Sequence, residues 1–232
     1  EKIMALSDEM ETRLAEMSGE MRGELLIGAS AGIAEFMLPP ILGEFNALYP
    51  QVRARLIVAN SDNIENRVAE PTLDVGLIET PSKRPGLDSE VCRADELVVI
   101  CAPDYPLAGA TEITPKALVD YEYISREPGS GTRNLTESYF LKHKVPPDSL
   151  KIQMELGSPE ALKGVVATGL GFAIMARVAV ERELESGQLL AISLKPKLKR
   201  NVHLIYQQDR FRSRLADTFI KFVKIKLREI AV

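Results

Sequence analysis

Apolar residues in the first part of the chain form short runs that alternate with segments of helical periodicity. Strands are expected over 23–32, 52–61 and 73–80, and helices over 36–50 and 63–70. The proline pair in 36–50 is compatible with the first turn of a helix. The alternation of strand and helix predicts the βαβ arrangement of a parallel sheet.

The second part of the chain repeats this alternation. The segment 91–103 is expected to hold one or two strands, and later strands are expected over 121–125, 150–156, 172–176, 189–194 and 201–207. Helices are expected over 131–144, 158–169, 177–187 and 212–230. The segment 158–169 begins with a Ser N-cap, and the last helix is long and amphipathic.

The pattern predicts two α/β halves, over about 24–100 and about 101–200, with a strand and a helix left over. Placing this last strand and helix back on the first half makes the chain cross between the halves twice. Two small α/β units joined in this way leave a cleft between them. Ligands of open α/β sheets bind in such crevices, at the carboxyl ends of strands.

Residues 1–22 show a separate helical pattern. The apolar residues Ile3, Leu6, Met10, Leu14, Met17 and Met21 share one helical face. One interpretation is an amphipathic helix that packs on its own domain, and the other is the end of a dimerising helix. We favour the second, because Gly23 separates the segment from the first strand. The chain begins at Glu1 within this pattern, so we expect it to be part of a longer protein.

Composition narrows the functional classes. The 232 residues are 45% hydrophobic and 27% charged, with a formal net charge of −4, so neither disorder nor a strongly basic nucleic-acid-binding protein is indicated. Cys92 and Cys101 lack C-x-x-C spacing, and we expect both to be buried and reduced in a cytoplasmic setting. No apolar run is long enough to predict a membrane span or a secretory signal.

Small and hydroxyl-bearing residues follow most of the predicted strands. These strand ends are Ser30, Ala31 and Gly32; Asn60, Ser61 and Asp62; Glu79 and Thr80; Ser125, Arg126 and Glu127; and Gly157 and Ser158. Small residues let a ligand approach the backbone, and hydroxyls both donate and accept hydrogen bonds. The helix N-termini that follow favour anions.

The stretch 125-SREPGSGTR-133 is the most specific of these strand ends. Gly129 and Gly131 permit a cluster of backbone N–H groups, Ser130 and Thr132 add hydroxyls, and Arg126 or Arg133 adds a guanidinium. The stretch is neither a P-loop nor G-x-G-x-x-G. It is therefore expected to bind an anion or, alternatively, to be only a tight corner with a helix cap. In the second case Arg133 forms an ordinary ion pair.

Catalytic chemistry is not indicated. His143 lies in a charged helix end and His203 begins a predicted strand beside basic residues, away from the strand ends. Nucleophile-elbow, zinc-protease and Cys metal-binding motifs are absent from the sequence. We therefore predict that the chain is not an enzyme and that it uses no metal or cofactor.

The order GELLIGAS, LPPILGEFNALYP, LDVGLIE, ELVVICAPDYPLA, ISREPGSGTR and MELGSPEALKGVVATGLGFAIMA resembles the effector-binding domain of LysR-type transcriptional regulators over nearly the whole chain. The resemblance implies two Rossmann-like subdomains joined by two crossovers, the type 2 periplasmic-binding-protein-like fold. Residues 1–22 would end a linker helix, 23–100 plus 201–232 would form regulatory subdomain I, and 101–200 would form subdomain II.

The family resemblance also implies function and partners. A small-molecule effector would bind between the subdomains, and contacts carried over by position are Ser30, Ala31, Asn60, Ser61, Ser125, Arg126, Thr132 and Arg133. Gly129, Ser130, Gly131 and Ser158 complete the predicted site. A homodimer through subdomain I, side by side and antiparallel, and a tetramer of the full-length protein are expected. DNA would bind only through an N-terminal winged helix-turn-helix that this sequence lacks.

The segment REPGSGTR is similar to that of regulators of carbon fixation and of sulfite and cysteine metabolism, which suggests a sulfur oxyanion or a phosphorylated compound as effector. A solute-binding protein of a transporter is the first alternative, and the helical segment 1–22 argues against it. A small-molecule enzyme is the second alternative, but it requires a nucleophile or acid–base pair that the strand ends do not supply.

Overall fold

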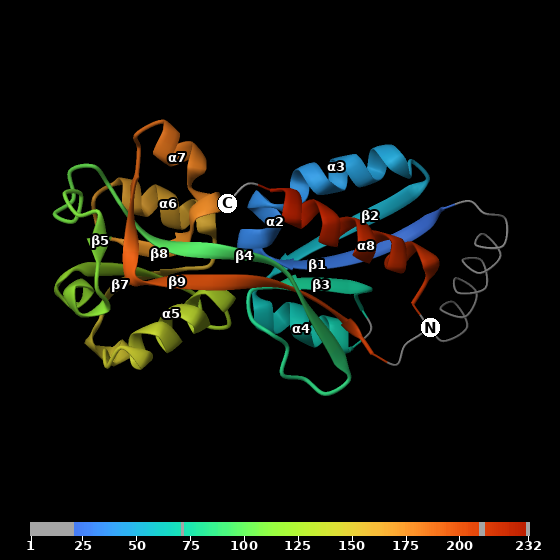
Figure 1. Ribbon diagram of the computed structural model, residues 1–232, viewed down its shortest axis with the longest axis horizontal. Helices are drawn as coiled ribbons and strands as arrows, with labels where there is room; N and C mark the ends of the chain where they lie inside the picture. Colours follow the sequence, from blue (N-terminus) through green and yellow to red (C-terminus); the bar gives the residue numbers. More distant parts are fainter. Residues whose placement is uncertain (1–20, 71, 209–211, 231–232) are drawn as a thin grey trace.

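The computed structural model describes residues 21–70, 72–208 and 212–230, and its elements form two lobes side by side (Figure 1). The strands are β1 Gly23–Ser30, β2 Val52–Ala59, β3 Val75–Ile78, β4 Leu87–Cys101, β5 Glu112–Ile113, β6 Glu122–Arg126, β7 Lys151–Leu156, β8 Ala173–Ala176 and β9 Leu190–Gln207. The α-helices are α2 Ala31–Phe36, α3 Leu38–Leu48, α4 Ser61–Ala69, α5 Gly131–Lys142, α6 Pro159–Ala167, α7 Glu181–Glu185 and α8 Arg214–Glu229. Short 3₁₀-helices span Pro115–Asp120, Pro147–Ser149 and Arg177–Ala179.

The first lobe is built on the parallel strands β2, β1 and β3, as the alternation of strands and helices predicts. The helices α2, α3 and α8 cover one face of this sheet, and α4 covers the other (Figure 1). The closing helix α8 buries Leu215, Phe219, Val223 and Leu227 against this sheet and α3. Every one of these parallel strands has its carboxyl end directed toward the second lobe.

The strands β4 and β9 join the two lobes. They pair with each other in antiparallel orientation along almost their whole length, and β9 also pairs antiparallel with β3. The sequence predicted separate strands over 189–194 and 201–207, and this prediction is wrong because β9 is continuous over 18 residues. The basic residues between the two apolar runs belong to the strand, and alternate side chains there, Leu198 and Arg200, are buried.

The second lobe combines two small groups of strands. Strand β8 pairs with β4 and β5 pairs with β9, while β6 and β7 form a separate parallel pair. Backbone hydrogen bonds between Phe172 and the β6 residues Glu122 and Ile124 connect this pair to the segment that leads into β8. Helices α5 and α6 lie on opposite sides of these strands (Figure 1). The lobe has its own core, which includes Phe140, Phe172 and Ile174.

Two helical segments differ from expectation. The small residues 31–36 after β1 form the short helix α2 rather than the end of a strand. The helix predicted over 177–187 is divided into a 3₁₀-turn and the short helix α7, which ends before Gly187 at a positive φ of 71°. The predicted helix over residues 1–22 lies almost entirely outside the described residues. The assignment of residues 1–22 to a linker helix therefore stays a prediction. The predicted boundaries of the two subdomains also stay a prediction.

Candidate functional site

The ends of β1 and β2 place two serine hydroxyls at the border between the lobes. Ser30 ends β1, Ser61 begins α4, and the parallel register sets Ser30 opposite Ala59 at the end of β2. Ser30 is 4% exposed and Ser61 is 1% exposed. Neither Oγ atom has a hydrogen-bond partner within the described part of the chain. A buried hydroxyl without a partner is unfavourable, which makes both side chains candidates for contact with a ligand.

The side chain of the neighbouring Asn60, unlike those of Ser30 and Ser61, has hydrogen-bond partners. Its side-chain oxygen accepts a hydrogen bond from the Asn63 N–H at 2.9 Å and caps α4, and its amide donates to the Pro128 carbonyl of the second lobe at 3.3 Å. The Asp62 N–H also reaches the second lobe, at the Gly129 carbonyl. The predicted site residue Asn60 therefore lies at the lobe border, but as a cap and an interlobe contact.

A buried charge cluster stands at the end of β3. Glu79 is 2% exposed and accepts a hydrogen bond from Nη1 of Arg200, which is also 2% exposed. Arg200 donates to Oδ2 of Asp95 through Nη2 at 2.9 Å and through Nε at 3.2 Å. Asp95 and Arg200 face each other on β4 and β9. Buried charges persist when they are paired and hydrogen-bonded, so this cluster fixes Glu79 in place.

The N-terminus of α5 brings the second lobe directly onto these groups. Thr132 Oγ1 donates to Glu79 Oε2 at 2.7 Å, and Ser130 caps the helix by accepting from the Arg133 N–H. A Cβ atom added at Gly131 would lie 2.6 Å from Ser61 Oγ and 2.8 Å from Glu79 Cβ. Only a glycine permits this approach. Gly129 adopts a positive φ of 84°, which turns the chain into the helix.

We call Ser30, Ser61, Glu79, Gly131 and Thr132 the interlobe site. It unites three predicted strand ends of the first lobe with the predicted GSGTR turn of the second. The first N–H groups of a helix have no intrahelical partners, but in α4 those of Asp62 and Asn63 already donate to Gly129 and Asn60, and in α5 that of Arg133 donates to Ser130. The N–H groups of Gly131 and Thr132, in the first turn of α5, are therefore the backbone donors that α5 offers here. Hydroxyls and helix N-termini are among the groups that bind an anion without a metal. Ala31 lies beside Ser30 and is 9% exposed.

The two predicted arginines already have partners inside the second lobe. Arg126 donates to both carboxylate oxygens of Glu127 and to the carbonyls of Leu156 and Gly157. Arg133 donates to Glu137 at 2.7 Å, to Glu155, and to the Arg126 carbonyl at 3.0 Å. The alternative interpretation of Arg133, an ion pair, thus describes its contacts. A role of either guanidinium on an effector stays a prediction.

The remaining predicted residues of the second lobe serve local structure. Ser125 is buried, and its hydroxyl donates to the Arg126 carbonyl. Burial raises the pKa of its neighbour Tyr123 to about 12. Ser158 is exposed and caps α6 by accepting from the Ala161 N–H at 3.3 Å. The structure thus leaves Ser158 outside the interlobe site.

A second contact between the lobes lies between α2 and α6. The ammonium group of Lys163, a buried residue, stands 4.7 Å from the ring centroid of Phe36. It also pairs with Glu183 at 2.7 Å and with Glu160 at 2.9 Å. Beside this contact, burial raises the pKa of Glu35, and the negative charge of Glu160 raises it further. The two lobes therefore meet through a polar face as well as through Gly131.

Sequence reasoning missed part of the site. Glu79 was recognised as a strand end but not as a site residue, although a carboxylate directly after the fully buried run VGLI is a usable signal. Arg200 and Asp95 gave no such signal, because the charged residues around them resemble a solvated segment.

Within the described residues, no group of three or more His, Cys, Asp or Glu side chains could hold a metal ion. His203 is buried, which lowers its pKa, and lies 3.3 Å from Ser89 Oγ. Cys92 and Cys101 are buried free thiols on β4, as predicted. No helix among the described residues is long and apolar enough to cross a membrane.

Comparison with known proteins agrees with the family resemblance. Residues 18–228 match the family described as the LysR substrate binding domain. YeiE of Escherichia coli K12, an uncharacterized HTH-type transcriptional regulator, is 32% identical over 92% of this chain and 72% of its own. The RuBisCO operon transcriptional regulator of Acidithiobacillus ferrooxidans is 31% identical over 90% of this chain and 67% of its own. CysL of Bacillus subtilis, an HTH-type transcriptional regulator, is 28% identical over 88% of this chain and 68% of its own.

A solved structure shows the same fold. The regulatory domain of CcmR from Synechocystis PCC6803, in complex with 2-PG, has a TM-score of 0.83 and 28% identity over 91% of this chain and 100% of its own. The predicted type 2 periplasmic-binding-protein-like fold is confirmed, and so is the resemblance to regulators of the CysL and RuBisCO type. These relatives are regulators, in agreement with the prediction that the chain is not an enzyme.

Proposed function

Because the chain belongs to the LysR substrate binding domain family, we propose that it senses a small anionic metabolite for a LysR-type transcriptional regulator. The metabolite, a sulfur oxyanion or a phosphorylated compound, binds at the interlobe site. Its binding changes the arrangement of the lobes and of the oligomer, and thereby controls transcription. The same proposal places the protein in the cytoplasm.

The pair of hydroxyls at Ser30 and Ser61 carries this proposal. An unsatisfied buried polar group costs about 1–3 kcal/mol, and no group in the described chain offsets this cost. An oxyanion accepts from both hydroxyls and from the N–H groups in the first turn of α5, whereas Asp62 and Asn63 of α4 already donate to Gly129 and Asn60. Relatives give independent support, since CcmR is named in complex with 2-PG and CysL and the RuBisCO regulators belong to the predicted subgroup.

The mechanism that fits this site is a population shift between two arrangements of the lobes. In the described arrangement, Gly131 packs on Ser61 and Thr132 binds Glu79, so the N-terminus of α5 already lies against the first lobe. An effector that contacts both lobes favours the arrangement in which it makes more contacts. Its differential affinity for the two arrangements sets the extent of the shift.

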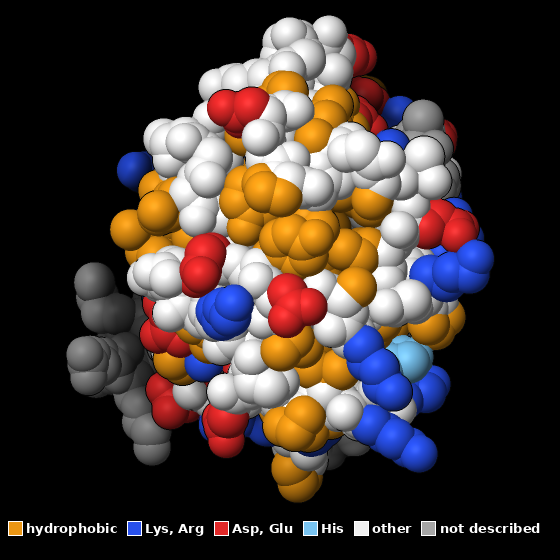
Figure 2. All heavy atoms as spheres, turned by 90° about the vertical axis from the view of Figure 1, so that its left-hand side faces the viewer, with side chains coloured by type: hydrophobic (Ala, Val, Ile, Leu, Met, Phe, Trp, Pro, Cys, Tyr) orange, Lys and Arg blue, Asp and Glu red, His pale blue; other side chains and the backbone are white. Residues whose placement is uncertain are grey.

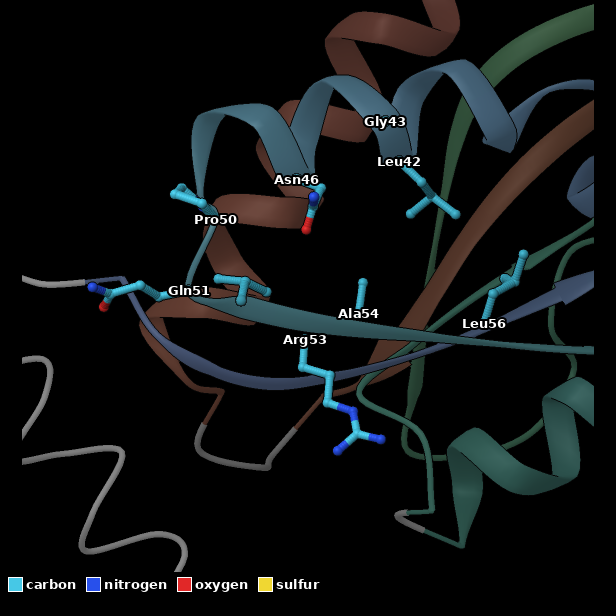
Figure 3. A pocket seen from close by; sticks show the side chains of 9 residues that line it. Leu42, Gly43, Asn46, Pro50, Gln51, Arg53, Ala54 and Leu56 are labelled. Carbon is cyan, nitrogen blue, oxygen red and sulfur yellow. The ribbon is translucent and has the colours of Figure 1, made fainter.

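A homodimer through the first lobe is the assembly we propose. A groove of about 530 Å³ runs between α3 and β2 on the outer edge of this lobe, lined by Leu42, Asn46, Val52, Ala54 and Leu56 among others (Figure 3). It lies away from the interlobe site, and we assign it to subunit contact rather than to the effector. Leu48 and Val58 beside it are 61% and 49% exposed.

The second lobe offers a surface for the other half of an antiparallel, side-by-side dimer. Hydrophobic side chains gather between charged ones on the end of this lobe (Figure 2). Its exposed large apolar residues include Ile152 and Met154 of β7, a strand with β6 on one side only in the described sheets. Unpaired sheet edges with apolar side chains are typical of association surfaces. A tetramer of the full-length protein and DNA binding through an N-terminal winged helix-turn-helix complete the proposal.

A thermal-shift panel tests the effector class. The chain is heated with sulfate, sulfite, thiosulfate, phosphate, 2-PG, nucleotides and sugar phosphates in turn. A ligand at about 100 times its Kd adds about 2.7 kcal/mol of stability, which corresponds to about 5–10 °C for a chain of this size. We expect one oxyanion class to give this shift and Thr132→Ala to reduce it. A shift from a neutral compound alone would contradict the anionic class.

A further inference from the structure

The carboxylate of Glu79 is the group in the interlobe site that least suits an anion. Glu79 and Ser61 pack against the same residue, because Ser61 Oγ and Glu79 Oε2 lie 2.6 Å and 3.0 Å from the position of a Cβ atom added at Gly131. A ligand that reaches Ser61 by displacing Gly131 therefore also meets Glu79. Its Oε1 accepts from Arg200, and its Oε2 accepts from Thr132 Oγ1. A carboxylate has about four acceptor positions, so each oxygen keeps one for a further donor.

The positive charge of Arg200 is shared between two carboxylates, so it does not fully neutralise Glu79. Arg200 also donates twice to Asp95, and the three side chains together carry one guanidinium and two carboxylates. The cluster therefore keeps one negative charge in a buried setting, where charge–charge interactions are stronger than in water. An anion that presents only acceptor oxygens to Glu79 meets both repulsion and an unmade hydrogen bond.

We propose that Glu79 is a specificity-determining residue, which admits anions that carry a hydrogen-bond donor and discriminates against fully ionised oxyanions. The favoured ligands are a protonated oxyanion or an anion with a hydroxyl group next to its charge. The inference rests on the proposed anion site at Ser30 and Ser61. It narrows that site, because Ser30 and Ser61 bind the charge while Glu79 accepts the donor.

Inorganic phosphate and sulfate are both anions, but only phosphate also carries a hydrogen-bond donor at neutral pH. The two ions have nearly the same size and shape, but at neutral pH every phosphate ion carries at least one proton and sulfate carries none. A hydrogen bond to a charged group is stronger than one between neutral groups, so an anion that cannot donate to the buried Glu79 carboxylate should bind at least about tenfold more weakly. If the Glu79 carboxylate accepts a hydrogen bond from the ligand, phosphate should bind at least about tenfold more tightly than sulfate.

The experiment is a calorimetric titration of the chain with each ion at neutral pH and constant ionic strength. Tighter binding of phosphate by at least about tenfold supports the inference. Sulfate binding as tightly as phosphate, or more tightly, overturns it and leaves the anion site intact. If neither ion binds at concentrations far above those of ordinary effectors, the anion site itself is contradicted, and the inference falls with it.

Two variants assign the discrimination to one side chain. Glu79→Gln keeps the shape and adds an N–H₂ donor, so the ratio of phosphate to sulfate affinity should fall toward one through tighter sulfate binding. Glu137→Gln removes a carboxylate of the same charge on α5 that pairs with Arg133 outside the site, and should leave the ratio unchanged. An unchanged ratio in Glu79→Gln would overturn the inference. If this variant does not fold, the wild-type ratio still decides.

Discussion

The strand ends of the two lobes carry similar residues but use them differently. In the first lobe, Ser30 and Ser61 are buried with hydroxyls that no described group engages. In the second lobe, Arg126 and Arg133 are bound to carboxylates and carbonyls of their own lobe. The first lobe thus supplies unpaired side chains, and the second supplies a helix N-terminus that closes over them.

A residue can therefore lie at a binding position without being available to bind a ligand. Arginine is the residue expected to bind an oxyanion through two parallel hydrogen bonds, but a guanidinium that already holds its partners must release them first. A buried serine without a partner has nothing to release. We therefore expect the charge of the effector to lie against the first lobe and the N-terminus of α5.

The largest expected effect follows from Arg200→Met. Glu79 and Asp95 would lose their shared partner in a buried setting, and removing one member of a buried ion pair costs about 3–5 kcal/mol. Urea denaturation of both proteins measures the change in the free energy of unfolding. The control is Arg55→Met, because Arg55 pairs with Glu24 at an exposed site where loss costs about 1 kcal/mol or less. Equal losses in the two variants would contradict the role of the buried cluster.

Gly131→Ala is expected to have the next largest effect. The added Cβ would overlap Ser61 and Glu79 across the lobe border, and overpacking of this kind costs about 1–3 kcal/mol. Gly164→Ala is the matched control, since Gly164 lies in α6 with no atom within 4 Å of an added Cβ. It should gain about 0.5–1 kcal/mol from helix propensity. A stabilised Gly131→Ala variant in thermal unfolding would show that the lobes do not depend on this contact.

Arg133→Ala should change the protein less. Its side chain pairs with the partly exposed carboxylates Glu137 and Glu155, so a loss of about 1 kcal/mol or less is expected. Effector affinity, measured by calorimetry, should fall less than in Ser61→Ala. A larger fall in Arg133→Ala would reverse the contrast between the lobes and restore the arginine as the main anion ligand.

The smallest expected effect concerns Glu35, which faces Glu160 of the second lobe. Burial and Glu160 raise its pKa above the ordinary value of 4.5, so the folded state favours the protonated form. The stability from this shift is present below the unfolded pKa and is lost as the pH rises through the raised folded pKa. Glu35→Gln should therefore be more stable than the wild type at neutral pH, by about 0.5 kcal/mol or less.

The pH dependence of Glu35→Gln is checked by urea denaturation between acidic and neutral pH. The difference from the wild type should disappear as the pH falls below the ordinary carboxyl value. A difference that stays constant over this range would show that ionisation of Glu35 does not contribute.

The sequence predicted most elements of the first lobe, because apolar runs and helix periodicity agree there with the tertiary structure. In the first lobe, strand β1 and helix α4 appear within two residues of the places that the pattern gives them, and in the second lobe Ser158 caps α6 as predicted. The sequence pattern predicted two separate strands where β9 is continuous, because Arg200 is buried within a basic segment. Burial of a charge depends on partners such as Glu79 and Asp95, which are 121 and 105 residues away along the chain.

The candidate site was predictable in position but not in chemistry. Small and hydroxyl residues after parallel strands indicate a shared edge, and Ser30, Ser61 and Thr132 do lie at the lobe border. Local sequence does not show that Arg126 has Glu127 and two carbonyls as partners, whereas the hydroxyl of Ser61 has none. That distinction depends on contacts between segments far apart in sequence.

The role of the first-lobe hydroxyls is tested by measuring both the free energy of unfolding and the effector affinity of Ser61→Ala. Removing an unpartnered buried hydroxyl should leave the free protein equally stable or more stable, while the affinity for the oxyanion found in the panel falls at least about tenfold. Ser213→Ala is the control, because Ser213 caps α8 and its loss should cost about 1 kcal/mol without changing affinity. A destabilised Ser61→Ala variant with unchanged affinity would contradict the account.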